Sequence, residues 1–340
     1  MINIRNRRYI GNKASLIKII KNAINDVQPC DDFSFLDLFA GTGVVSYEFA
    51  EEGHPVILND ILFSNYISYQ AWFSYQKYDK KKIKMYIDNY NLLRYEDIDD
   101  NYFSNIYSNK YFSYNDAKKI GYIRDDIERN KGCLNEREYA ILVTSLLYAS
   151  DKIANTVGHF ESFLKTKPKD SFFKLEELNL KTFNNAMFYN TDANKLAKEI
   201  SADVVYLDPP YNARQYINFY HVLENLARWD KPTEFEGDSM KFKRNHLKSG
   251  YSRAIAPTLF EDLILSLNCK VIVVSYNNTY SAQSSASNNK IQEHEILEIL
   301  QRKGRVTKKE ISYKFFNAGK TNFKEHKEFL FICKVEENAK

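Results

Sequence analysis

The sequence predicts an α/β fold in which a mostly parallel sheet is interrupted by a long helical insertion. Three observations support this prediction. Residues 33–60 read as strand, glycine turn, helix and strand, residues 61–185 are polar with helical periodicity, and strand-like apolar runs resume from residue 186. Because strand–helix–strand units build parallel sheets, the two outer parts of the chain are expected to form one core.

The first half of the predicted core is defined by apolar periodicity and by one glycine turn. Apolar residues at a helical spacing predict a helix at 14–27. The runs FSFLDLF (33–39) and PVILND (55–60) predict buried strands, and VVSYEFAEEG (44–53) between them predicts a helix. The glycine turn lies between the first strand and this helix, so it is expected at the sheet edge where such folds bind ligands.

The remaining elements set the domain boundaries. The strongest helical pattern of the insertion spans 137–157, and a Ser/Asn-rich stretch at 281–289 predicts a flexible loop. Further strands are predicted at 186–190, 203–207, 270–276 and 328–335, with a helix at 290–304. We therefore predict a core domain of residues 1–60 and 186–340 with residues 61–185 inserted.

The composition excludes some classes of protein and permits others. A net charge of +4 over 340 residues permits a polyanionic partner without requiring one. Four well-separated cysteines with no CxxC pair, and six scattered histidines, argue against a disulfide framework and against a bound metal. The polar, basic N-terminus and the lack of a membrane-length apolar run predict a cytoplasmic protein with no membrane contact.

Two glycines in DLFAGTG (37–43) predict a close approach of the backbone to a ligand. Gly41 and Gly43 do not form the G-x-G-x-x-G pattern of dinucleotide sites, because Ser46 occupies the third glycine position. Asp60 ends the second strand, where a carboxylate can accept hydrogen bonds from ribose hydroxyls or, alternatively, stabilise a turn or cap a helix. The sequence contains no phosphate-binding Gly-Lys-Ser/Thr signature, so a nucleoside without a pyrophosphate fits best.

The stretch YLDPPY (206–211) predicts a rigid site at the end of another strand. The apolar run before it reads as a buried strand. Pro209 and Pro210 end that strand, because proline donates no backbone hydrogen bond and restricts its own φ. Asp208 and Tyr211 are therefore expected in fixed positions at the sheet edge.

Four blocks, taken in their order along the chain, resemble the motifs of one enzyme family. RRYIGNK (7–13), DLFAGTG (37–43), ND (59–60) and DPPY (208–211) are similar to motifs of the bacterial D12-class DNA adenine-N6 methyltransferases, whose modification domains recur in restriction–modification systems. Further similar blocks extend the resemblance over most of the chain, at 158–165, 191–194, 208–230 and 273–281.

This resemblance implies a Rossmann-like fold that binds S-adenosylmethionine at the carboxyl ends of its strands, with S-adenosylhomocysteine as product and no metal. It also implies that the insertion at 61–185 recognises the target DNA. The implied cofactor-binding residues are Tyr9 and Lys13 beside the methionine part, Asp37, Phe39, Gly41 and Gly43 in the turn beneath it, Asp60 at the ribose, Asp192 at the adenine, and Asp208.

The implied chemistry depends on the DPPY block. An exocyclic adenine amine is a poor nucleophile because its lone pair is delocalised into the ring. Hydrogen bonds from this amine to the Asp208 carboxylate and the Pro209 carbonyl would favour an sp³-like nitrogen that attacks the methyl group in line. Pro209 and Pro210 keep the site rigid, and Tyr211 would stack on a base flipped out of the duplex.

Several basic and aromatic residues are candidates for contact with DNA. The stretch KFKRNHLKSGYSR (241–253) combines basic with aromatic side chains, and a solvated loop is the alternative. A second basic cluster at 302–309 is instead predicted to cap the C-terminus of a helix. The candidate residues are Lys241, Lys243, Arg244 and Arg253, with Arg214, His159 and Phe160, for which ion pairing or core packing is the alternative.

Together these features predict a site-specific bacterial DNA methyltransferase that forms N6-methyladenine in a short duplex sequence. Its expected partners are double-stranded DNA and, within a restriction–modification system, a cognate restriction endonuclease. N4-cytosine methylation is the alternative within the same chemistry, although Asp at the first motif position favours adenine. RNA adenine methylation and a catalytically silent DNA-binding protein on the same fold are further alternatives.

Overall fold

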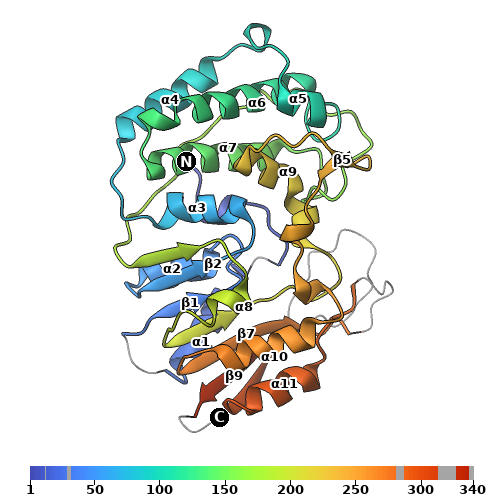
Figure 1. The fold of residues 1–340 in the computed structure, drawn as a ribbon. Helices are drawn as coiled ribbons and strands as arrows, with labels where there is room; N and C mark the ends of the chain where they lie inside the picture. Colours follow the sequence, from blue (N-terminus) through green and yellow to red (C-terminus); the bar gives the residue numbers. More distant parts are fainter. Residues whose placement is uncertain (12, 29–31, 281–286, 313–326, 337–340) are drawn as a thin grey trace. The chain divides into compact units, whose positions relative to one another are not determined.

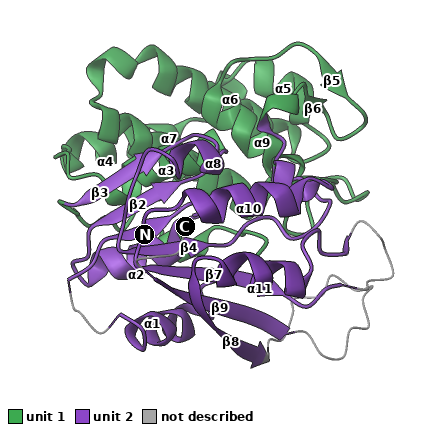
Figure 2. Ribbon diagram, turned by 60° about the horizontal axis from the view of Figure 1, so that its bottom comes forward, with its two compact units in different colours: residues 1–12, 62–184, 217–246 green, residues 13–61, 185–216, 247–340 purple. Residues whose placement is uncertain are grey.

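The chain folds into two compact units, which we call the sheet unit and the helical unit (Figures 1 and 2). The computed structural model describes residues 1–11, 13–28, 32–280, 287–312 and 327–336. The sheet unit comprises residues 13–61, 185–216 and 247–340, and the helical unit comprises residues 1–12, 62–184 and 217–246. The helical unit thus takes in two segments, 1–12 and 217–246, that the sequence assigned to the core domain.

The sheet unit is built on one seven-stranded sheet. The strands, in their order across the sheet, are β3 (Ala186–Tyr189), β2 (Val56–Asn59), β1 (Phe35–Asp37), β4 (Val204–Leu207), β7 (Val271–Asn277), β9 (Lys327–Val335) and β8 (Gly304–Ser312). The first five run parallel, and β9 is antiparallel to both of its neighbours. The predicted α/β fold with a mostly parallel sheet is confirmed.

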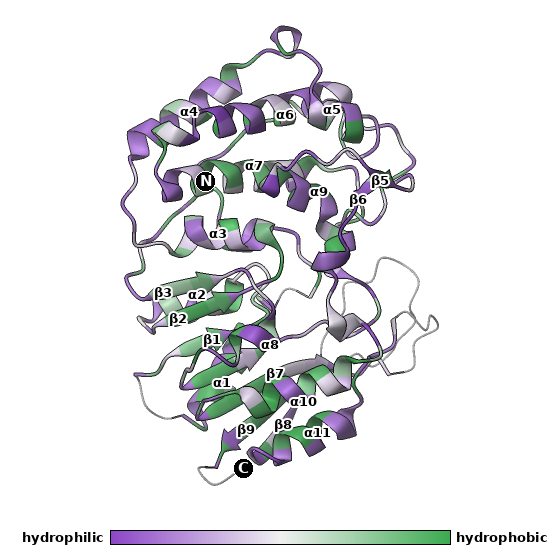
Figure 3. Cartoon of the chain, viewed as in Figure 1, coloured by the Kyte–Doolittle hydropathy of each residue, from purple (hydrophilic) through white to green (hydrophobic). Residues whose placement is uncertain are grey.

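Helices cover both faces of this sheet because consecutive residues of its central strands are apolar and buried, and these strands are green in Figure 3. Leu36 of β1 belongs to a core with Phe260 of α10, whereas its neighbour Phe35 stacks on Phe49 of α2, with ring centroids 4.1 Å apart. The helices of the unit are α1 (Ile17–Asn25), α2 (Val44–Glu51), α8 (Ala193–Leu196), α10 (Ala256–Ser266) and α11 (Glu293–Gln301).

The edge strand β8 corrects one prediction. The basic cluster at 302–309 was expected to cap a helix, but only Arg302 and Lys303 lie at the end of α11, and the residues from Gly304 form a strand. Lys308 pairs with Glu293 at 2.6 Å, and Lys309 pairs with Asp26 at 2.6 Å. Charged side chains suit an exposed edge strand, which weakens its apolar signal in the sequence. Of the predicted loop at 281–289, residues 281–286 lie outside the described residues.

The helical unit is an assembly of helices with one short hairpin. Its helices are α3 (Phe63–Phe73), α4 (Lys80–Leu92), α5 (Tyr102–Tyr107), α6 (Tyr114–Arg129), α7 (Glu136–Ile153) and α9 (Tyr216–Arg228), and its hairpin strands are β5 (Phe235–Glu236) and β6 (Lys241–Phe242). Four of the helices begin at a polar cap, namely Asp79, Asn101, Ser113 and Asn135. Each cap accepts hydrogen bonds from the otherwise unpaired amides of the first turn.

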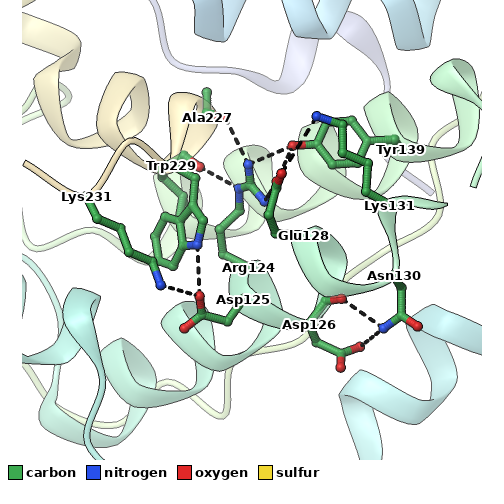
Figure 4. Close-up of polar contacts among 11 residues, drawn as sticks. Arg124, Asp125, Asp126, Glu128, Asn130, Lys131, Tyr139, Ala227, Trp229 and Lys231 are labelled. Carbon is green, nitrogen blue, oxygen red and sulfur yellow. Dashed lines mark hydrogen bonds and ion pairs between the residues drawn. The ribbon is translucent and has the colours of Figure 1, made fainter.

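Arg124 on α6 stabilises the end of α9 (Figure 4). Its buried guanidinium donates to the carbonyl oxygens of Leu226 at 2.8 Å and Ala227 at 3.2 Å. It also pairs with Glu128 at 2.9 Å and lies 5.4 Å from the ring centroid of Trp229. These contacts satisfy carbonyls that the last turn of a helix leaves without an intrahelical partner. Among the helices that the structure describes, none combines the length and apolar character needed to cross a membrane.

Candidate active site

Four acidic side chains of the sheet unit lie at the carboxyl edge of its sheet. Parallel strands end at the same edge, so the residues that follow β1, β2 and β4 converge there. The chain proceeds from β1 to β2 and β3 on one side and from β4 to β7 on the other, so the strand order reverses between β1 and β4. This gap is the switch point where such folds bind ligands. Because β9 runs antiparallel, it contributes its first residues to this edge. The four carboxylates are Asp37, Asp60, Asp208 and Glu328.

A hydrogen bond connects the glycine turn to Asp60. Gly41 and Gly43 have φ values of +55° and +78°, a left-handed conformation that a side chain would strain. The amide of Gly41 donates to Asp60 Oδ2 at 3.0 Å. Asp60 is buried and does not cap α3, whose cap residue is Leu62. Asp60 therefore stabilises the turn, which is one of the two roles considered for it.

Asp37 is a buried carboxyl group with an unsatisfied oxygen. It is 1% exposed, and its Oδ2 accepts a hydrogen bond from Ser46 at 3.1 Å. No described residue donates to its Oδ1. Burial raises the pKa of Asp37 to about 8, and the Ser46 hydrogen bond opposes this rise. A buried polar oxygen without a partner is costly, so the site favours a ligand that forms a hydrogen bond with Oδ1.

Lys13 connects the DPPY motif to the far end of the chain. Its Nζ lies 2.7 Å from the Tyr211 hydroxyl, 2.9 Å from Asp208 Oδ2 and 3.2 Å from Glu328 Oε1. The Tyr211 hydroxyl also contacts Asp208 Oδ1, and it lies 2.9 Å from Glu328 Oε1. We call these four residues the Lys13 cluster. It brings together Lys13, Asp208 and Tyr211, which the sequence assigned to the site.

The Lys13 cluster places one buried cation beside the buried Glu328 and the half-buried Asp208. Burial lowers the pKa of Lys13, but Asp208 and Glu328 outweigh burial and raise it. Burial raises the pKa of Asp208, Lys13 lowers it, and the negative charge of Glu328 raises it further. Burial and the two carboxylates also raise the pKa of Tyr211, so its hydroxyl stays protonated. Lys13 and Tyr211 are therefore the donors of the cluster, and oxygens of Asp208 and Glu328 accept from them.

Glu328 is the member of the cluster that sequence reasoning missed. It begins the predicted strand EFLFICKV and pairs in register with Asn277 at the end of β7. An acidic residue at the first position of an apolar strand was the available signal. That signal gives neither the strand's direction nor its neighbour, and both are needed to bring Glu328 to the edge.

The backbone of Tyr211 fixes the DPPY turn. Its carbonyl oxygen accepts from the Lys290 amide at 2.7 Å and from the Tyr276 hydroxyl at 3.2 Å. The ring of Tyr211 packs edge-on against Tyr276, with centroids 4.6 Å apart. Pro209 is buried and Pro210 is half-buried. The rigid turn expected from the two prolines is thus also held by contacts from outside the motif.

The other predicted cofactor residues lie in different settings. Phe39 packs edge-on against Tyr251, with centroids 5.1 Å apart, and remains half-buried. Asp192 is exposed after β3, where it caps α8 by accepting from the Lys195 amide at 3.1 Å. Tyr9 belongs to the helical unit, where it stacks on Tyr220 with centroids 4.7 Å apart and an angle of 6°.

The predicted DNA contacts divide into exposed and buried side chains. Arg214, Lys243 and Arg253 are exposed, while Lys241 on β6 and His159 are half-buried. Phe160 is fully buried, which favours the packing alternative for it. Arg244 is buried as well, pairing with Glu236 at 2.9 Å and donating to Asn218 Oδ1 at 2.8 Å. Its guanidinium is therefore engaged within the fold, in line with a structural ion pair.

No group of three or more His, Cys, Asp or Glu side chains is arranged to hold a metal ion within the residues that the structure describes.

A mostly parallel sheet with a glycine turn after β1 and carboxylates at its carboxyl edge defines a Rossmann-like α/β protein. More particularly, residues 9–280 match the model of the D12 class N6 adenine-specific DNA methyltransferase family. The chain belongs to this family.

Three relatives illustrate the similarity. Modification methylase StsI of Streptococcus sanguinis is 37% identical over 80% of this chain and 44% of its own length. Modification methylase LlaI of Lactococcus lactis subsp. lactis is 33% identical over 80% of this chain and 46% of its own length. Type II methyltransferase M.NlaIII of Neisseria lactamica is 31% identical over 94% of this chain and 95% of its own length. The chain thus spans less than half the length of the first two relatives.

Proposed function

We propose that this protein transfers a methyl group from S-adenosylmethionine to the N6 amine of an adenine in a short duplex DNA sequence. The observation that carries the proposal is the position of Asp208. This carboxylate lies at the switch-point edge of the sheet, in a rigid turn, and is paired with Lys13 at 2.9 Å. Membership of the adenine-specific family supports the choice of base.

The edge residues fit a cationic nucleoside cofactor. Asp37 has a buried oxygen without a partner, and such an oxygen suits an ammonium or a hydroxyl donor. Gly41 and Gly43 have no side chains, so the backbone of the turn can approach a ligand closely at these two positions. Asp60 contacts the turn through the Gly41 amide. When bound, S-adenosylmethionine supplies a methyl group activated by its sulfonium. Tyr9 and Asp192 remain proposed cofactor-binding residues.

The DPPY residues prepare the amine for attack. Each Asp208 oxygen contacts one partner in the Lys13 cluster, and a carboxylate oxygen has two lone pairs, so acceptor capacity remains for the amine. The Pro209 carbonyl is the second proposed acceptor. Both bonds favour the pyramidal nitrogen whose lone pair is available, and Tyr211 is proposed to stack on the extruded base.

Contacts with duplex DNA are proposed for both units. The helical unit contains the segment proposed to recognise the target sequence. Lys243, Arg214 and Arg253 are exposed cations suited to phosphate contact, whereas Phe160 and Arg244 are engaged within the fold. Action on DNA implies a cytoplasmic location in a bacterium, and relatives named modification methylases make a cognate restriction endonuclease the expected companion.

Methyl transfer to DNA tests the proposal. Labelled S-adenosylmethionine is incubated with unmethylated genomic DNA, followed by nucleoside analysis and base-resolved sequencing. We expect N6-methyladenine confined to one short motif. N4-methylcytosine would overturn the base, and label in RNA alone would overturn the substrate class. Neither cofactor crosslinking nor methyl transfer would favour a silent DNA-binding protein, whereas crosslinking without transfer would indicate a missing partner or a silenced enzyme.

The matched control is Asp208→Ala. Loss of the carboxylate acceptor is expected to lower kcat at least about 100-fold, the scale seen when one group that stabilises a transition state is removed. DNA affinity, measured by fluorescence anisotropy, should change little. Turnover at the wild-type rate would contradict the role of Asp208.

A further inference from the structure

Glu328 occupies a position in the site that no motif of the sequence accounts for. It is 7% exposed and is the second residue of β9, beyond the 9–280 segment that matches the family model. Its Oε1 accepts from Ser275 Oγ at 2.8 Å, which fixes the carboxylate against the neighbouring strand β7. A buried carboxylate in contact with Lys13 at 3.2 Å therefore enters the site from the far end of the chain.

Glu328 is one of the groups that accept from Lys13. An ammonium group has three N–H donors, and Asp208, Tyr211 and Glu328 all lie within hydrogen-bonding distance of it. The Tyr211 hydroxyl has one proton but contacts both carboxylates. The hydroxyl can therefore donate to Glu328 when the Asp208 carboxylate accepts a hydrogen bond from another donor.

The charges of the cluster also favour a role for Glu328 in the site. If Asp208 were the sole carboxylate beside Lys13, the cation would draw on its lone pairs and weaken it as an acceptor for a neutral amine. A second carboxylate shares the cation, so the three groups together carry one net negative charge and Asp208 keeps its acceptor strength. Such effects are strong where water is excluded, and Lys13 is 6% exposed.

We propose that Glu328 is a positioning residue that holds and neutralises Lys13 while the Asp208 carboxylate binds the target amine. This inference rests on the proposed function, since it assigns a role in the same reaction. Glu328 does not touch the reacting atoms and acts through its two neighbours. The competing explanation is a purely structural ion pair that ties β9 to the residues before α1.

A pH profile separates the two explanations. Asp208 accepts the amine only when ionised, so the acid limb of kcat against pH reports its pKa. The charged and titratable groups that face Asp208 are Lys13, Glu328, Tyr211, Tyr206, Tyr216 and Asp37. The negative charge of Glu328 raises the pKa of Asp208. Its removal therefore lowers that pKa and moves the acid limb to lower pH.

Three variants and one control test the proposal in the full chain. Glu328→Gln keeps the shape but not the charge, and should move the acid limb to lower pH. Glu328→Asp keeps the charge and should leave the limb where the wild type has it. Glu328→Ala should lower kcat by about 10-fold to 100-fold, as expected for a misplaced catalytic group, with little change in KM for DNA. Glu310→Gln, on neighbouring β8 and paired with Lys308 and Lys327, should change neither quantity.

A second readout needs no catalysis. Modification of Lys13 by an amine-reactive reagent, followed by peptide mass spectrometry, should be faster in Glu328→Gln than in the wild type or Glu310→Gln, because the ammonium loses one carboxylate. If the wild type fails to methylate DNA, the proposed function is wrong and this labelling still tests Glu328. An unmoved acid limb, or equal labelling of Lys13 in all proteins, would overturn the proposal for Glu328.

Discussion

At the scale of single residues, the four carboxylates of the sheet edge differ because their neighbours differ. Asp60 accepts from a backbone amide, and Asp208 shares a lysine with Glu328. Asp37 has a serine hydroxyl at one oxygen and no described donor at the other. Identical chemical groups therefore lie in three settings: Asp60 shapes a turn, Asp208 and Glu328 share a lysine, and Asp37 has one oxygen without a described donor.

Asp60→Ala should weaken cofactor binding by about 1.5–3 kcal/mol, the range for a hydrogen bond that involves a charged group. Isothermal titration calorimetry with S-adenosylmethionine measures this change. Asp60→Asn is the matched control, because its amide oxygen can still accept from Gly41 and preserve the turn. We expect its affinity to lie between those of the wild type and Asp60→Ala. Unchanged dissociation constants in both variants would remove Asp60 from the site.

Asp37→Asn should change the pH dependence of stability. Burial raises the pKa of Asp37 from 3.8 to about 8, so between these values the folded state holds a proton that the unfolded state has lost. Stability due to this group therefore falls as pH rises through that window, by about 1.4 kcal/mol per pH unit at most.

Urea unfolding at several pH values from 5 to 9, without cofactor, checks this prediction. The free energy of unfolding of Asp37→Asn should increase relative to the wild type as pH rises. Parallel curves for the two proteins would show that Asp37 is not held in its protonated form.

At the scale of elements, local patterns predicted which segments form helices and strands, but they did not predict which strands pair or which helices contact each other. The apolar runs at 55–60, 203–207 and 270–276 became β2, β4 and β7 with small shifts of their ends. Strand β8 was missed because its charged residues mask the apolar signal. The support that α9 receives from Arg124 was equally hidden, because it joins residues about a hundred positions apart.

Arg124→Met should destabilise the protein by about 2–5 kcal/mol. The variant leaves two buried carbonyls of α9 without donors and removes a buried guanidinium that is well satisfied. Arg129→Met is the control on the same helix, where an exposed ion pair with Asp126 should be worth less than about 1 kcal/mol. Equal unfolding midpoints for the two variants in urea would contradict the role assigned to Arg124.

At the scale of the whole molecule, charge must favour DNA through local placement, because the net charge is only +4. Some basic residues near the predicted DNA contacts are neutralised within the fold, as Arg244 is by Glu236. Exposed cations such as Lys243 remain available to phosphates. Binding should therefore depend on salt through a small number of contacts.

Lys243→Ala should weaken DNA binding and lower the slope of log K against log salt concentration by about 1, the value for one lost phosphate contact. Fluorescence anisotropy at several salt concentrations measures this slope. Lys270→Ala is the control, since this exposed lysine pairs with Asp203 at the amino end of β7, away from the carboxyl edge. If both variants keep the wild-type slope, Lys243 makes no phosphate contact.

The sequence by itself determined the fold class, the glycine turn after the first strand, and the proline turn that holds Asp208 and Tyr211. These features depend on local patterns, because apolar periodicity, glycine and proline act on the residues beside them. The tertiary structure alone decided that Glu328 joins Lys13, that β8 closes the sheet, and that Arg124 supports α9. Each of these depends on strand direction or on packing between distant segments, which long-range burial and hydrogen bonding select and no local pattern contains.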